Sequence, residues 1–163
     1  MKRLLAGIFM VVAVISLTAM TGAARAEEYQ KYCNARFGFC VEYPARLTME
    51  PPPVNDDGRV FTDGQGLRLT ASGINNVMEE TLASARLSQE REFDRVSYRS
   101  GGSNWYVLSG YKGDKIIYLK TFVGRGSINH LYISYPAFKK AEYDDMVTRV
   151  SRSWVPGELD EGH

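Results

Sequence analysis

Alternating apolar and polar positions dominate the chain between residues 104 and 135. The apolar positions here are mainly aromatic or β-branched, the residue types that fit the half-buried surface of a β-sheet. Two short connections divide this segment, Lys112-Gly113 and Gly124-Arg125-Gly126. Both contain glycine, which provides the positive φ that tight turns require. The pattern therefore predicts three consecutive antiparallel strands at 104–111, 114–123 and 127–135.

Shorter alternating segments precede this meander. Pro44 ends the first of them, and the three prolines at 51–53 cannot donate backbone hydrogen bonds, so they predict an extended surface stretch. Asn, Asp and Gly residues at 55–58 and 63–66 indicate turns, the second of which joins two strands into a hairpin. Strands are predicted at 38–43, 59–62, 67–72 and 96–99, with a further short extended piece at 47–50.

Two other segments show the spacing of three to four residues that is typical of a helix. In the first, predicted at 77–92, apolar side chains share one face, and Asn76 with Glu79 matches the capping-box pattern at its start. The second, predicted at 138–153, has acidic residues in its first half and basic residues near its end, which suits the helix dipole. Because two helices interrupt the strands without regular βαβ alternation, the chain is predicted to be α+β with an antiparallel sheet.

The first 26 residues have the composition of a Sec-type signal peptide. Lys2 and Arg3 form its basic start, residues 4–20 are mostly apolar, and Ala24-Arg25-Ala26 provides a cleavage site. The apolar run is also about as long as the shortest membrane-spanning helix, so an uncleaved anchor is the alternative. We expect a periplasmic or secreted protein with a single domain at 27–157 and a polar, frayed tail at 158–163.

The charge of the predicted mature chain disfavours two classes of partner. Removing the leader's Lys2, Arg3 and Arg25 from the 20 basic residues leaves 17 against 19 acidic residues, a net charge of −2. No cluster of basic residues remains, whereas nucleic acids and anionic membranes are bound by clustered Lys and Arg. Neither nucleic-acid binding nor membrane insertion after signal cleavage is expected.

Cys33 and Cys40 are predicted to form a disulfide, because an even number of cysteines in an exported chain favours pairing. Turn-forming residues separate them, so the bond would join two short antiparallel strands and contribute about 2.5 kcal/mol in the chain-entropy model. Metal binding is the alternative, but a tetrahedral site needs four ligands and no further Cys or His is near. A redox dithiol more usually has C-x-x-C spacing.

No side-chain pattern predicts a catalytic, cofactor or metal site. His130 lies in a predicted strand without a second His or carboxylate at the spacing of a ligand or catalytic base, and His163 is the last residue. Asp56, Asp57 and Asp63 could suggest calcium, but their neighbours fit turns and the spacing is not that of an EF-hand. The G-x-S-x-G, Walker A and G-x-G-x-x-G motifs are absent from the sequence.

The order of these elements resembles the Mog1/PsbP family. The resemblance covers most of the predicted mature chain, and the predicted signal peptide makes this chain an exported bacterial member. It implies an α/β/α sandwich around a central antiparallel sheet, a non-catalytic domain and a role in binding another protein. The Cys33–Cys40 pair and the triple proline are not family features, and no binding residue is carried over. The matching segments are FGFCVEYP at 37–44, the helix after LRLTASG, WYVLSGYKGDKIIYLKTF at 105–122, LYISYP at 131–136 and YDDMVTRVSRSWVP at 143–156.

Tyrosine is the feature that folding explains least, since six tyrosines fall on the last four predicted strands. Alternation divides them between two faces, and an exposed patch of Tyr, Trp and Arg would favour protein contact. The predicted function is an exported, non-catalytic protein-interaction module of the bacterial envelope, with another envelope protein as its partner. The predicted interaction surface consists of Arg99, Trp105, Tyr111, Tyr118 and Tyr132.

Two alternatives remain open at this point. The chain could be an exported hydrolase or small-ligand-binding protein with a site near Trp105, Tyr118 and His130. It could also have a purely structural role in the envelope.

Overall fold

The computed structural model describes residues 26–162. Apart from Ala26, the predicted signal peptide lies outside the described residues, as does His163. Among the described helices, none is long and apolar enough to cross a membrane.

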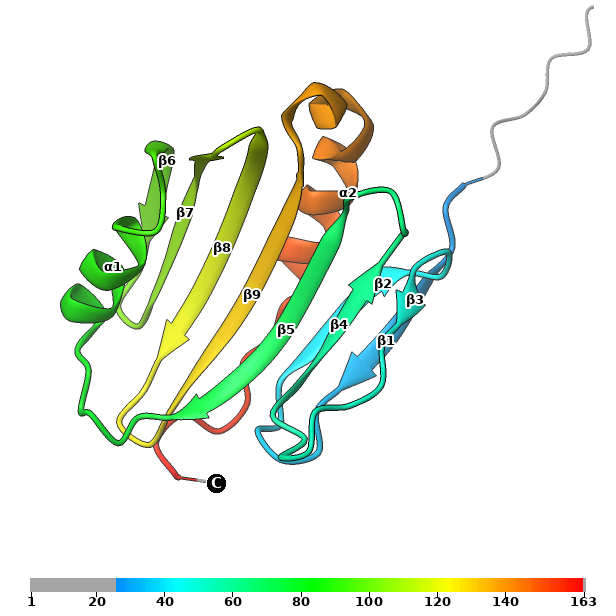
Figure 1. Cartoon of the computed structure of the whole chain (residues 1–163). Helices are drawn as coiled ribbons and strands as arrows, with labels where there is room; N and C mark the ends of the chain where they lie inside the picture. Colours follow the sequence, from blue (N-terminus) through cyan, green and yellow to red (C-terminus); the bar gives the residue numbers. More distant parts are fainter. Residues whose placement is uncertain (1–25, 163) are drawn as a thin grey trace, which may run out of the picture.

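A seven-stranded antiparallel sheet forms the centre of the structure (Figure 1). The strands are β3 (Thr48–Met49), β4 (Gly58–Thr62), β5 (Arg68–Asn75), β6 (Arg95–Gly101), β7 (Trp105–Lys112), β8 (Lys115–Val123) and β9 (Ser127–Pro136). Their order in the sheet is β3-β4-β5-β9-β8-β7-β6, so the predicted meander together with β6 forms one half and the earlier hairpin together with β3 forms the other.

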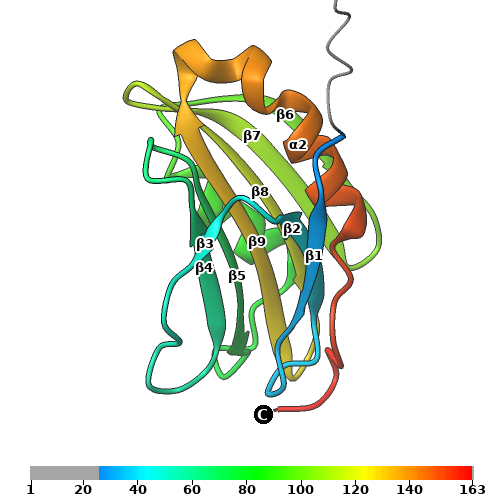
Figure 2. The ribbon, with the colours of Figure 1, turned by 90° about the vertical axis from the view of Figure 1, so that its right-hand side faces the viewer.

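Two layers cover the sheet from opposite sides. On one face lie the helix α2 (Lys140–Ser153) and the separate hairpin of β1 (Tyr29–Cys33) and β2 (Cys40–Pro44), as Figure 2 shows. The helix α1 (Leu82–Glu90) lies on the other face, where it contacts β7. The predicted α+β fold with a central antiparallel sheet is confirmed.

Each face of the sheet has its own hydrophobic core, because side chains alternate between the faces of a strand. The larger core joins α2 and the β1–β2 hairpin to the sheet, and it includes Phe39, Phe61, Leu131, Ile133, Val150 and Trp154. The smaller core, under α1, consists of Ala85, Tyr106, Leu108, Leu119, Val123 and Ile128.

The predicted disulfide between Cys33 and Cys40 is present, with a sulfur–sulfur distance of 2.02 Å. The two residues face each other in the β1–β2 register, as a bond joining two antiparallel strands requires. The chain that follows α2 then pairs with β2, because Val155 and Cys40 exchange two backbone hydrogen bonds of 2.9 and 3.0 Å. The hairpin, its disulfide and the end of α2 therefore form one connected unit.

The start of the first helix differs from the prediction. The helix begins at Leu82 and is capped by Thr81 and Ser84, rather than starting at 77 with Asn76 and Glu79 as its caps. The Asn76 side chain instead bonds to the Glu80 amide and to the Gly124 carbonyl. These bonds compete with helix formation, and Glu79 takes a φ of 53°, outside the helical region.

The start of the second predicted helix also differs from the prediction, whereas its end at Ser153 is as predicted. Its first turn is a separate 3₁₀ helix, Ala137–Lys139, before α2 begins at Lys140. The tail at 158–163 was expected to fray, but the Leu159 carbonyl accepts hydrogen bonds from the Gly126 and Ser127 amides at 2.9 and 3.0 Å. The tail is thereby attached to the β8–β9 turn.

Candidate functional site

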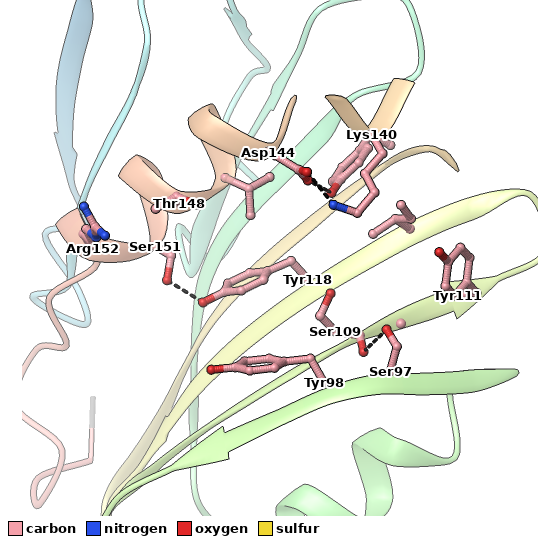
Figure 3. Close-up of a pocket in the computed structure, with 14 residues that line it drawn as sticks. Ser97, Tyr98, Ser109, Tyr111, Tyr118, Lys140, Asp144, Thr148, Ser151 and Arg152 are labelled. Atoms are coloured by element: carbon pink, nitrogen blue, oxygen red, sulfur yellow. Dashed lines mark hydrogen bonds and ion pairs between the residues drawn. The ribbon is translucent and has the colours of Figure 1, made fainter. Parts of the chain in front are cut away.

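A groove of about 550 Å³ lies between α2 and the strands β6 and β7, of which β6 is at the edge of the sheet (Figure 3). It exists because α2 packs over β8 and β9 and leaves the neighbouring part of the same face open. We call it the tyrosine groove, after the four tyrosines in its lining. Its lining residues are Ser97, Tyr98, Ser109, Gly110, Tyr111, Ile116, Tyr118, Tyr135, Lys140, Asp144, Val147, Thr148, Ser151 and Arg152.

The strand register places the tyrosines in two rows across the sheet. Tyr98 of β6 pairs with Ser109 of β7, which in turn pairs with Tyr118 of β8. Because neighbouring strands lie about 4.8 Å apart, the backbones of the two tyrosines are separated by about 10 Å, with only a serine between them. Figure 3 shows the two rings standing on either side of this serine.

The second row lies two residue pairs further along the strands, on the same face of the sheet. Tyr111 of β7 pairs with Ile116 of β8, which pairs with Tyr135 of β9. Tyr135 is only 3% exposed and therefore belongs to the floor of the tyrosine groove, whereas Tyr98 is 55% exposed at its rim. The lining thus changes from buried to open towards the edge of the sheet.

A β-bulge in β6 turns Tyr98 into the groove. The register shifts between Val96 and Tyr98, so one extra residue, Ser97, stands against β7. If side chains alternated strictly through Ser97, Tyr98 would point to the same face as Val96, the face covered by α1. Gly110 allows the close approach of the bulged strand, since a Cβ at this position would lie 2.1 Å from the Arg95 carbonyl oxygen.

Helix α2 supplies the opposite wall. The hydroxyls of Ser151 and Tyr118 form a hydrogen bond, and Lys120 donates from Nζ to the Ser151 carbonyl at 3.0 Å. Towards the start of the helix, Lys140 forms an ion pair with Asp144. The wall is thereby tied to β8 at its C-terminal end and carries charges at both ends.

Two of the tyrosines that line the groove, Tyr118 and Tyr135, remain neutral at physiological pH. Burial raises the pKa of Tyr118, and burial together with the nearby Asp144 charge raises the pKa of Tyr135 to about 12. Burial also lowers the pKa of Lys120 beside the groove. The Tyr118 and Tyr135 hydroxyls therefore keep their protons at neutral pH and can donate hydrogen bonds.

The structure brings together only part of the predicted interaction surface. Tyr111 and Tyr118 line the tyrosine groove, and Trp105 lies further along the same face of β7, against Phe122. Arg99 instead pairs with Glu90 of α1 at 2.9 Å, and Tyr132 packs against the core under α1. The five residues therefore do not form one contiguous surface.

The residues of α2 that form the wall were not predicted from the sequence, and the predicted surface did not include Tyr98. The alternation in β7 and β8 could have placed Tyr111 and Tyr118 on one face. No sequence signal marked the bulge that brings Tyr98 to the same face.

The structure does not assemble the alternative site at Trp105, Tyr118 and His130. His130 lies on the face of β9 opposite to Leu131 and pairs with Thr121 of β8, whereas Tyr118 pairs with Ile133 on the α2 side. The Nδ1 atom of His130 lies 2.9 Å from the Thr121 hydroxyl oxygen. The sheet therefore separates this imidazole from the other two side chains.

His130 is expected to make the protein less stable in acid. Burial lowers the pKa of His130 to about 4, whereas the unfolded chain binds this proton near 6.5. Between these two values the unfolded state binds more protons, so stability falls as the pH falls from 6.5 towards 4, by about 3 kcal/mol in total.

The test compares urea unfolding of the wild type and of His130→Gln at pH 7.5 and pH 4. The wild type should lose about 3 kcal/mol more than the variant, which removes the titrating group. An equal loss in both proteins would contradict the prediction.

The aspartates considered for calcium have other roles in the structure. Asp63 accepts hydrogen bonds from the Gln65 and Leu67 amides and from the Tyr143 hydroxyl, as turn and packing contacts. Asp56 pairs with Arg59 at 2.6 Å. Over residues 26–162, no group of three or more His, Cys, Asp or Glu side chains could hold a metal ion.

Comparison with known proteins bears on the fold. No family model and no curated protein sequence matches this chain. The solution structure of cyanobacterial PsbP (CyanoP) from Synechocystis sp. PCC 6803 is similar in three dimensions, with a TM-score of 0.58 and 14% sequence identity. The match covers 86% of this chain and 98% of the CyanoP chain. The sequence resemblance is therefore confirmed at the level of architecture, and the chain has a PsbP-like fold.

Proposed function

We propose that this chain is an exported, non-catalytic module of the bacterial envelope that binds another envelope protein through the tyrosine groove. The lining of the groove carries the proposal. Tyrosine is enriched at protein interfaces because its large ring provides contact area at low entropic cost and its hydroxyl provides a hydrogen bond. Tyr98 is 55% exposed on an edge strand, where folding alone does not require an aromatic side chain.

The side chains of the groove favour binding over catalysis. A serine nucleophile needs a base within hydrogen-bond reach, but the partner of Ser151 is Tyr118, whose pKa is raised by burial. Asp144 is the one carboxylate in the lining, and it forms an ion pair with Lys140. This set of side chains suits a surface that holds a partner without reacting with it.

Two further features support export. The composition of residues 1–26 is that of a Sec-type leader. The Cys33–Cys40 disulfide is a bond that persists in oxidising compartments and is rare in the cytosol.

Site-specific photo-crosslinking in the native envelope tests the proposal. A photo-reactive phenylalanine analogue replaces Tyr98 at the rim of the groove, and in the control it replaces Leu87, which is 55% exposed on α1. We expect one abundant adduct from position 98 and none from position 87, because only the first faces the groove. The adduct should disappear when Ser109→Leu fills the space beside Tyr98 and Tyr118.

Two results would reject the proposed function. The same adducts from both positions would mean that capture is unrelated to the groove. An absence of any adduct from position 98, with the protein present in the envelope at its normal amount, would mean that the groove has no protein partner there.

A further inference from the structure

The row of Tyr98, Ser109 and Tyr118 forms a slot with a definite shape. Two aromatic rings stand on alternate strands, about 10 Å apart at the backbone, and a small side chain forms the floor between them. Such a slot admits a compact apolar ring more readily than a branched chain. Grooves lined by aromatic side chains are the common receptors for proline-rich segments, which bind as preformed polyproline II helices.

The hydrogen-bonding groups of the groove match the same kind of occupant. Within the described part of the chain, the hydroxyls of Tyr98 and Tyr111 form no hydrogen bond, so both can donate to a bound molecule. A polyproline II segment has no internal hydrogen bonds and presents free carbonyl oxygens, while proline itself has no N–H that needs an acceptor. Free donors on the protein therefore meet free acceptors on the segment.

Addition of a β-strand to the edge of the sheet is the other way to bind an extended chain, and β6 is poorly suited to it. The strand carries Arg95 and Arg99 and is interrupted by the bulge at Ser97. Charged side chains and bulges are features that protect edge strands from pairing. A segment that needs no backbone ladder fits this edge better.

The charge at the end of the groove indicates what should flank the prolines. Arg152 is exposed at the C-terminal end of α2 and, among the described residues, forms no ion pair. Lys140 at the other end is already paired with Asp144. An acidic side chain on the bound segment would complement Arg152.

We propose that the tyrosine groove binds a proline-rich, extended segment of the partner protein, with a proline ring between Tyr98 and Tyr118 and an acidic residue near Arg152. This rests on the proposed function and adds the chemistry of the partner. The chain's own prolines at 51–53 adjoin β3 at the opposite edge of the seven-stranded sheet, so they cannot fill the groove of the same molecule.

The test uses a blocked hexaproline peptide with one aspartate at each end, titrated into the isotope-labelled protein 27–163 and followed by NMR. We expect saturable chemical-shift changes at Tyr98, Ser109 and Tyr118. The Kd should be below about 1 mM and should rise with added salt. A peptide of alternating serine and glycine with the same aspartates is the control and should bind at least tenfold more weakly.

Four variants make the test specific to the slot. Tyr98→Ala and Ser109→Leu should each weaken peptide binding at least tenfold, the first by removing one ring and the second by filling the space between the rings. Tyr98→Phe keeps the ring but removes the hydroxyl donor, so it should weaken peptide binding, and by less than Tyr98→Ala does. Phe138→Ala is the control: it removes an exposed aromatic ring that does not line the groove, so it should bind the peptide as the wild type does. The NMR spectra of the variants report directly whether each one folds.

Several results would overturn the proposal. The first three are the absence of chemical-shift changes with several millimolar hexaproline peptide, equal affinity for the serine–glycine peptide, and unchanged binding of hexaproline by Ser109→Leu. If maltotriose shifts the NMR signals of the same residues and hexaproline does not, the groove binds carbohydrate. If the protein self-associates and Pro52→Ser abolishes that self-association, the bound segment belongs to a second copy of this chain. Adducts from position 98 in the envelope without peptide binding would leave the proposed function intact and reject the proline-rich segment alone.

Discussion

Gly157→Ala is expected to destabilise the protein by about 3 kcal/mol or more, at the upper end of what overpacking costs. A Cβ at this position would lie 1.7 Å from the Phe37 carbonyl oxygen and 2.7 Å from its carbon. Both are backbone atoms, so no side-chain rotation relieves the clash. The Gly157 amide also donates to the Asn129 side-chain oxygen at 2.9 Å, which fixes this segment between the turn at 34–39 and strand β9.

Urea unfolding of the wild type and of two glycine variants measures this effect. Gly162→Ala is the matched control, because a Cβ there meets no atom within 4 Å, and its free energy of unfolding should stay within about 0.5 kcal/mol of the wild type. If Gly157→Ala unfolds at the same urea concentration as the wild type, the tail after α2 does not pack as described.

The position of Gly157 also illustrates which parts of the structure could be predicted from the sequence. The residues Pro156-Gly157 end a helix in any reading of the chain, since both terminate helical periodicity. The tight contact with Phe37 depends on a turn more than 100 residues earlier, and no local pattern encodes such a contact. Helix termination was therefore predictable, and the packing of the tail was not.

The strands of the meander were predicted to within one residue at most ends because their signals are local. Alternation and the turn glycines operate over a few residues, and Gly113 indeed has a φ of +58°. The start of α1 was missed because its determinant is distant. The Asn76 side chain bonds to the Gly124 carbonyl at 2.8 Å, across 48 positions of sequence, and this bond holds the preceding residues in a turn.

The groove was predicted in part for the same reason. Tyr111 and Tyr118 share a face by simple alternation, and both were in the predicted surface. Tyr98 joins them only because one extra residue in β6 reverses the alternation. The contributions of Ser151 and Arg152 depend on how far α2 extends over the sheet, which is a property of tertiary packing.

Trp154→Ala is expected to have the other large effect, a loss of about 3–5 kcal/mol in the free energy of unfolding. Trp154 caps the C-terminus of α2, is 3% exposed and packs on Phe39 with ring centroids 5.0 Å apart. Its removal leaves a cavity between α2 and the β1–β2 hairpin. The neighbouring Val155→Ala is the control; this side chain is 57% exposed, and its loss should change stability by less than about 0.5 kcal/mol.

The Trp154 variant also links the stability of the fold to the groove. Ser151 and Arg152 lie within one turn of Trp154, and Ser151 bonds to Tyr118 across the groove. If Trp154 anchors this end of α2, Trp154→Ala should increase amide hydrogen exchange at 150–153 by at least tenfold more than at β8 and β9 in the same molecule. A uniform increase over the whole chain would mean that Trp154 stabilises the fold without specifically holding the wall of the groove. A local increase would mean that the position of Ser151 and Arg152, and with it the geometry of the binding slot, is set by packing on the disulfide-linked hairpin.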